Sequence, residues 1–242
     1  VFATGTSSEN PRAELYSFGT GKRELIGETR LDSTITSFES IKYAKTDEGT
    51  SIYADALCAD GSSMVTEFIY WSDYYNSIIS PFYSYSTGRT KETLRSSQVT
   101  CRDIDDDGYI EIPEDTSSKK QSSEITSQNW VNYGNTVLSH KCYSFSCKRD
   151  GYILVIDDDD FSKVKANYDS ESRKLTIIDK KNKSNVFEIV TLINSNYSVN
   201  DPKYKDYTMI MKNSGFVYLA KVNKSSDIDI NIQTLKDMIK VY

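Results

Sequence analysis

The residues best suited to do chemistry lie in one acidic stretch, RDIDDDGYIEIPED, at residues 102–115. Its carboxylates alternate before Gly108, which permits a sharp turn, and oxygen ligands at such spacing suit a hard cation. Like charges this dense repel one another unless water, distance or a cation separates them. The sequence therefore predicts a calcium site, whose candidate ligands are Asp103, Asp105, Asp107, Tyr109 through its carbonyl oxygen, and Glu111.

This loop differs from an EF-hand, and an unoccupied acidic turn is the alternative. An EF-hand loop carries a bidentate glutamate at position twelve. That position falls here on Glu114, three residues beyond Glu111, and the flanking residues favour strands instead of helices. A second acidic run at residues 157–160 has neither a glycine nor a ligand periodicity. We interpret that run as a solvated turn.

Catalytic motifs are scarce. His140 is the only histidine, which excludes two-histidine metal motifs. Cys142 lies two positions away, so a Cys–His dyad is conceivable, but an ordinary strand histidine is the simpler interpretation. The chain has no G-x-S-x-G, no P-loop and no G-x-G-x-x-G. We therefore expect a protein that is not an enzyme, with a hydrolase that uses an unrecognised carboxylate pair as the alternative.

The cysteines favour buried free thiols over disulfides, without excluding a bridge. None forms a C-x-x-C pair, and the two in KCYSFSCK are five apart, which places them on opposite faces of a continuous strand. The disulfide state stays open for Cys58, Cys101, Cys142 and Cys147.

A cluster of aromatic residues, YWSDYYNSIISPFYSY, supplies the candidate binding surface. Exposed rings suit sugar faces or a partner protein. Packing of alternate aromatic residues within strands explains the same pattern. The candidate ligand-binding residues are Tyr70, Trp71, Tyr74 and Tyr75.

Charge and hydropathy narrow the class of protein. A net charge of -6 and a pI near 5.0 argue against a nucleic-acid partner. The sequence contains no run of eighteen or more apolar residues, so it predicts no transmembrane segment. The chain opens VFATGTSS, without a methionine or a signal-like segment, so we expect a mature form or a fragment with any export signal upstream.

The pattern of apolar residues predicts a mainly β or α+β protein in two parts. Short aromatic and β-branched runs separated by Gly- and Asp-containing turns predict an antiparallel region at 1–113, either a partial propeller or a small sandwich. Residues 114–129 lack aromatic residues and predict a linker. Residues 130–242 predict an antiparallel sheet with a C-terminal helix from Ile228, capped by Ser226 or Asp227.

The acidic stretch resembles the D-x-D-x-D-G-x-x-E loops of FG-GAP and related β-propeller repeats. Its ending, EIP, resembles a signature of exported lipoproteins of clostridia and related Firmicutes. The resemblance implies calcium between neighbouring strands, a propeller-type region before a small α+β domain, and an extracytoplasmic protein of unassigned activity. Asp106 stands where these loops often have asparagine, and the resemblance supplies no catalytic residue.

These observations together predict an exported, calcium-stabilised binding or scaffold protein at the cell surface or outside the cell. Its expected partner is a saccharide or a surface protein. A carbohydrate-active hydrolase and a structural domain of a larger surface assembly are the alternatives. The oligomeric state is left open.

Overall fold

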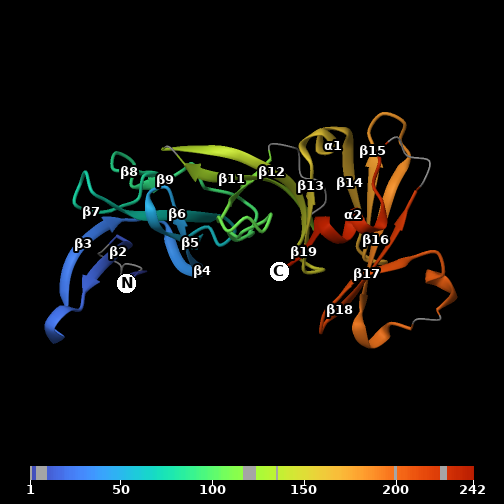
Figure 1. Cartoon of the computed structure of the whole chain (residues 1–242), viewed down its shortest axis with the longest axis horizontal. Coiled ribbons are helices and arrows are strands. Elements are labelled where there is room, and N and C mark those ends of the chain that lie inside the picture. Colours follow the sequence, from blue (N-terminus) through green and yellow to red (C-terminus); the bar gives the residue numbers. More distant parts are fainter. Residues whose placement is uncertain (1, 4–9, 117–123, 135, 199–200, 224–227) are drawn as a thin grey trace. The chain divides into compact units, whose positions relative to one another are not determined.

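The computed structural model describes residues 2–3, 10–116, 124–134, 136–198, 201–223 and 228–242 (Figure 1). The chain forms two compact units. The first comprises residues Val1–Asp115 and Asn129–Lys141, and the second comprises Thr116–Gln128 and Cys142–Tyr242. Every strand pair whose register is given is antiparallel, and short helices accompany the sheets. The predicted mainly β, α+β class is therefore confirmed.

Three small antiparallel sheets build most of the first unit. The order within them is β1-β2-β3, β4-β5-β6-β7 and β8-β9. Antiparallel strands that pair in chain order occur both in propeller blades and in the layers of a sandwich. The choice between a partial propeller and a small sandwich therefore stays open. The strands are β1 (Phe2–Ala3), β2 (Arg12–Ser17), β3 (Glu24–Arg30), β4 (Ile35–Thr46), β5 (Gly49–Cys58), β6 (Met64–Ser72), β7 (Ser77–Ile79), β8 (Tyr83–Ser84) and β9 (Arg89–Thr90), with a 3-10 turn at η1 (Gly19–Gly21).

The pair β5–β6 carries a core on each face, because successive side chains of a strand point to opposite sides. Ile69 packs into one cluster with Ala56 and Val65, whereas its neighbour Phe68 packs into another with Tyr53. The second cluster also contains Cys101, just before the acidic loop of residues 102–111, and Ile110 and Ile112, at the end of that loop. The loop is thus anchored on both sides by buried residues.

A further sheet has the order β10-β11-β12-β13-β19. Its strands are β10 (Ile112–Asp115), β11 (Ile125–Gly134), β12 (Val137–Cys147), β13 (Tyr152–Ile156) and β19 (Ile239–Val241). The predicted linker at 114–129 is therefore wrong at both ends, where the chain is in β10 and β11. Its central residues, 117–123, lie outside the described residues.

The second unit contains the five-stranded sheet β14-β15-β16-β18-β17. Strands β15, β16 and β18 are mostly buried and apolar, as expected of strands covered on both faces. The elements are α1 (Asp158–Lys163), β14 (Val164–Asp169), β15 (Lys174–Asp179), β16 (Asn185–Ile193), η2 (Asn194–Asn196), η3 (Pro202–Tyr204), β17 (Thr208–Lys212), β18 (Phe216–Val222) and α2 (Ile232–Met238).

The C-terminal helix is present but shorter than predicted. Asn231 caps α2, since its side chain accepts hydrogen bonds from the backbone N–H groups of Gln233 and Thr234. The predicted caps, Ser226 and Asp227, lie outside the described residues. After Met238 the chain becomes β19, in which Ile239 pairs with Leu154 of β13. The acidic run at 157–160 also differs from the predicted turn, because it begins α1.

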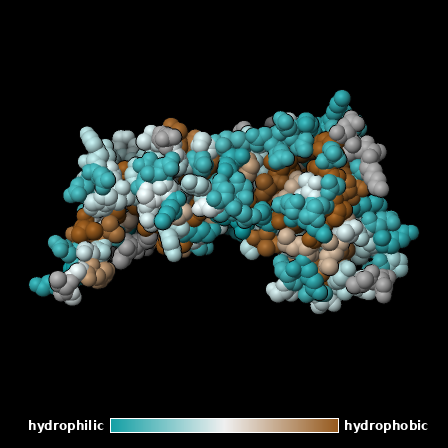
Figure 2. All heavy atoms as spheres, viewed as in Figure 1, coloured by the Kyte–Doolittle hydropathy of each residue, from teal (hydrophilic) through white to brown (hydrophobic). Residues whose placement is uncertain are grey.

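Two further expectations concern the surface and the thiols. No helix in the described ranges is long and apolar enough to cross a membrane. The visible face in Figure 2 is mostly hydrophilic, with hydrophobic residues reaching it in separate patches. No disulfide joins the four cysteines, all of which are described: Cys58, Cys101 and Cys147 are buried, and Cys142 is partly buried.

Candidate cation site

The acidic loop is closed by a short antiparallel bridge between Arg102 and Glu111. The N–H of Arg102 donates to the Glu111 carbonyl at 3.1 Å, and the N–H of Glu111 donates to the Arg102 carbonyl at 2.9 Å. Within the loop, the Asp103 carboxylate accepts from the backbone N–H groups of Asp107 at 3.0 Å and Gly108 at 2.9 Å. Gly108 has φ +90°, a left-handed conformation that favours glycine. Local chemistry therefore folds the loop back on itself.

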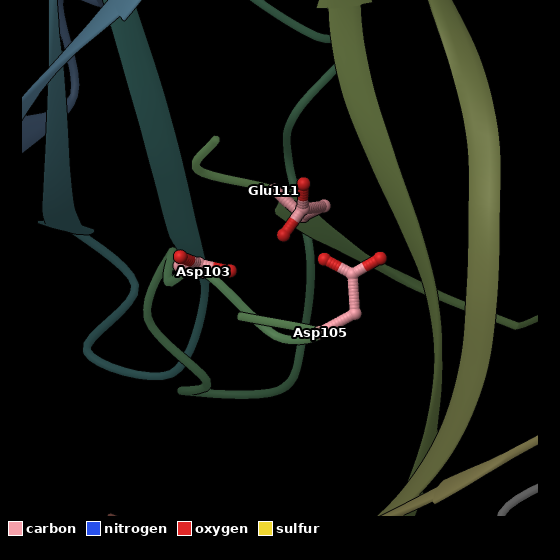
Figure 3. A group of neighbouring side chains, drawn as sticks. All are labelled: Asp103, Asp105 and Glu111. Carbon is pink, nitrogen blue, oxygen red and sulfur yellow. The ribbon is translucent and has the colours of Figure 1, made fainter. Parts of the chain in front are cut away.

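Three carboxylates converge in this loop. Ligand oxygens of Asp103, Asp105 and Glu111 all lie within 4.8 Å of one another (Figure 3). Asp105 is exposed, Asp103 is partly buried, and Glu111 is fully buried. Together the three side chains could hold a metal ion.

Glu111 is the residue that most needs a partner in this loop. Its Oε2 accepts a hydrogen bond from the N–H of Ile104 at 3.0 Å. Its Oε1 is buried and has no hydrogen-bond partner among the described residues. A buried polar atom without a partner is costly. A cation held between Glu111 and the two aspartates would satisfy this oxygen.

The electrostatics of the metal-free loop point the same way. Burial raises the pKa of Glu111 to about 7, and repulsion from Asp105, Asp107 and Asp103 adds to the effect, although the Ile104 N–H opposes it. The loop therefore resists holding all its carboxylates ionised without a positive charge between them.

Lys141, in the β12 strand, supplies one such charge, at the outer side of the loop. Its Nζ lies 2.5 Å from Asp107 Oδ2 and 3.1 Å from Asp105 Oδ2. These contacts raise the pKa of Lys141, and the hydrogen bond from Lys141 is the largest cause that lowers the pKa of Asp107. The other oxygen of Asp107 accepts from the N–H of Tyr109 at 2.9 Å.

The predicted ligand set is therefore only partly brought together. Asp103, Asp105 and Glu111 converge, whereas the Asp107 carboxylate is engaged by Lys141 and by the Tyr109 backbone. The predicted role of the Tyr109 carbonyl stays a prediction. Lys141 was not predicted, because it is 34 positions from Asp107 and only the fold brings the two together.

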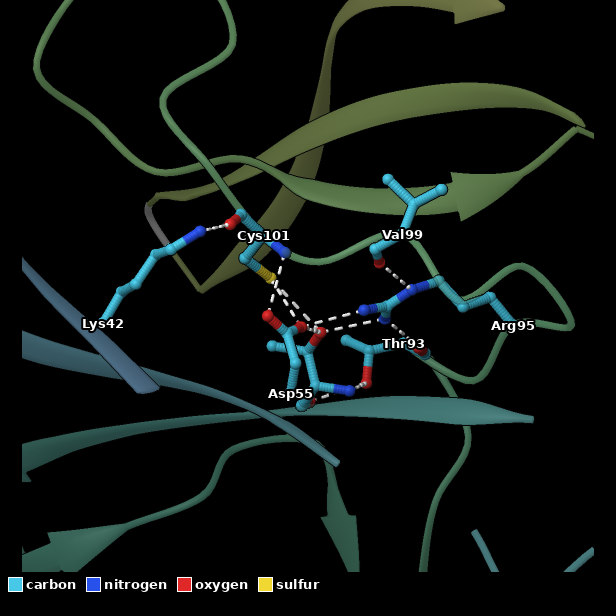
Figure 4. A network of polar contacts seen from close by, with 7 residues as sticks. Lys42, Asp55, Thr93, Arg95, Val99 and Cys101 are labelled. Atoms are coloured by element: carbon cyan, nitrogen blue, oxygen red, sulfur yellow. Dashed lines mark hydrogen bonds and ion pairs between the residues drawn. The ribbon is translucent and has the colours of Figure 1, made fainter. Parts of the chain in front are cut away.

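A buried ion pair holds the chain just before the loop (Figure 4). Nη2 of Arg95 lies 2.8 Å from Oδ1 of Asp55 in β5, and both side chains are fully buried. Asp55 also accepts from the backbone N–H of Cys101 at 2.9 Å, while Arg95 donates to the Val99 carbonyl at 2.9 Å. Lys42 donates to the Cys101 carbonyl. The backbone preceding Arg102 is thereby fixed to the core of the first unit.

The four aromatic candidates divide into two kinds. Tyr70 packs partly buried in the core cluster of Phe68, and Trp71 packs partly buried against the other core cluster. Tyr74 and Tyr75 lie in the turn between β6 and β7, with 88% and 65% of their surfaces exposed. Their rings meet edge to face at 4.8 Å. Of these four candidates, Tyr74 and Tyr75 are therefore the two with exposed rings.

His140 is exposed, and its ring is hydrogen-bonded to the side chain of Asn129. Asn129 in turn donates to Glu114 at 2.9 Å.

Comparison with protein-family models, with curated proteins and with solved structures finds no significant match to this chain.

Proposed function

We propose that this chain is a binding or scaffold module of the cell surface, stabilised by calcium in the acidic loop. The observation that supports the cation most directly is the buried Oε1 of Glu111, which has no hydrogen-bond partner among the described residues and belongs to the carboxylate triad. An anionic oxygen in this position is incomplete without a cation or a proton.

Calcium fits the donor set better than other common metals. The triad offers carboxylate oxygens only, which suit calcium, whereas zinc prefers nitrogen and sulfur ligands. Magnesium demands a near-ideal octahedron. Calcium accepts an irregular shell of six to eight oxygens, to which carbonyl groups and water contribute. Extracellular calcium modules bind at about 0.1–1 mM, and an affinity in that range would let the site fill outside the cell.

Calcium is expected to stabilise the folded protein. At about 100 times its dissociation constant it should add roughly 2.7 kcal/mol to the free energy of unfolding, because it binds the folded form preferentially. The Tm should rise by several degrees. Thermal unfolding in calcium and in excess chelator measures the shift, and calorimetric titration gives the dissociation constant.

Matched variants locate the site. Asp105→Asn should abolish the shift, because Asp105 belongs to the triad. Asp159→Asn, an equal change of charge in α1, should leave the shift intact. If calcium does not change the Tm of protein that has first been freed of metal by a chelator, the loop is a plain acidic turn.

Tyr74 and Tyr75 support a saccharide or protein partner, since open aromatic faces suit such ligands. We expect the double variant Tyr74→Ala/Tyr75→Ala to lose binding on a glycan array or surface-protein panel while the Tm stays within about 1 °C of the parent. The matched control is Tyr43→Ala, which removes another exposed ring, in β4. Equal binding by parent and double variant would exclude these two rings as the binding surface.

The converging carboxylates of Asp103, Asp105 and Glu111 do not support the hydrolase alternative. Retaining glycosidases need two carboxyl groups about 5 Å apart, one of them with a raised pKa, which Glu111 and the aspartates superficially provide. Glu111 is, however, fully buried in the loop, so a sugar ring has no access to it. The triad is therefore better suited to a small ion than to a glycosidic bond.

A further inference from the structure

Lys141 shares a carboxylate with the candidate cation site. Its Nζ is 3.1 Å from Asp105 Oδ2, and Asp105 is one of the three carboxylates that converge. The same ammonium is 2.5 Å from Asp107 Oδ2. Lys141, in β12, therefore compensates the charge of Asp105 and Asp107, whereas Oε1 of Glu111 has no hydrogen-bond partner among the described residues.

We propose that Lys141 is a built-in competitor of the divalent cation and sets its affinity. This inference rests on the proposed function and adds the regulation of that site. Without the metal, the ammonium offsets repulsion between Asp105 and Asp107. When the metal binds Asp105, the ammonium must either leave that carboxylate or remain within a few ångströms of a second positive charge. Both outcomes oppose binding of the metal.

Because Lys141 compensates the charge of two carboxylates, the metal-free loop depends only partly on a cation for its charge balance. Two ion pairs with Lys141 hold the outer carboxylates in place before any cation arrives. Linkage requires the opposition to be mutual: calcium weakens the hold of the loop on Lys141 as much as Lys141 weakens the hold on calcium. The affinity of the site and the accessibility of Lys141 should therefore change together.

Neutralising Lys141 tests the proposal on the full chain. Lys141→Gln should bind calcium about tenfold more tightly in calorimetric titration, because two partly exposed ion pairs no longer compete. Lys141→Arg, which keeps the charge, should bind within about twofold of the parent. The control is Lys45→Gln in β4, an equal change of net charge at an exposed lysine of the same unit, and it should bind as the parent does. Equal or weaker binding by Lys141→Gln would overturn the proposal.

A second measurement uses the unaltered protein. Acetylation of Lys141 by an amine-reactive ester, followed by mass spectrometry, should be several-fold faster in calcium than in chelator with potassium chloride at matched ionic strength. An unchanged rate at saturating calcium would also overturn the proposal. If neither the parent nor Lys141→Gln binds calcium, the proposed cation site itself fails. If calcium binds but its affinity does not depend on Lys141, the proposal that Lys141 competes fails, while the proposed cation site stands.

Discussion

Replacing Arg95 by methionine is expected to lower the free energy of unfolding by about 3–5 kcal/mol, because the change leaves the buried Asp55 carboxylate without its cation. Both side chains of this pair are fully buried. After the change, Asp55 keeps the Thr66 hydroxyl and the Cys101 N–H as donors. Neutral donors do not replace a full positive charge. The carbonyls of Val99 and Thr93 also lose the Arg95 donors.

Urea denaturation followed by tryptophan fluorescence measures this loss with probes that lie in the first unit. The chain has two tryptophans, Trp71 and Trp130, and both belong to that unit. Asp55→Asn/Arg95→Met should be less destabilised than Arg95→Met, because the unpaired charge is removed with its partner. Arg12→Met, which breaks a partly exposed pair with Glu14, should cost less than about 1 kcal/mol. Equal losses for Arg95→Met and Arg12→Met would contradict the expected cost of the buried charge.

In chelator, the protein is expected to lose stability as the pH rises from 5 to 8. Burial raises the pKa of Glu111 from 4.5 to about 7, so the folded state holds a proton that the unfolded state has released. The proton stabilises the fold fully below the unfolded pKa, and this contribution is lost as the pH rises through the folded pKa. A shift of this size corresponds to at most about 3 kcal/mol.

The isosteric variant Glu111→Gln isolates this contribution. The introduced amide imitates the protonated carboxyl group at every pH, so the difference in unfolding free energy between parent and variant should change by most of that amount between pH 5 and 8. Saturating calcium should remove most of this trend in the parent, because the bound metal holds the carboxylate ionised over most of this pH range. Parallel pH profiles of parent and variant in chelator would contradict a raised pKa at this position.

The candidate site was open to prediction because most of it is local. Asp103, Asp105 and Glu111 lie within one loop, and the alternation of aspartates with Gly108 fixes their approach within a few residues. The role of Asp107 was not open in the same way, because its ion pair with Lys141 depends on where β12 runs. Likewise, Asp55 and Arg95 are 40 positions apart, and the sequence does not indicate that these two residues form an ion pair.

The sequence by itself determined the β-rich class, the turn-forming loop and the presence of a helix near the C-terminus. These features follow from side-chain periodicity and from chain geometry over a few residues. Tertiary structure decided where that helix ends: Ile239 fits a helical spacing, but pairing with Leu154 in β13 makes it a strand residue. It also divided the aromatic cluster, because Tyr70 and Trp71 lie in β6, against the cores, while Tyr74 and Tyr75 lie in the turn. Burial and strand pairing depend on distant parts of the chain, and a local pattern does not contain them.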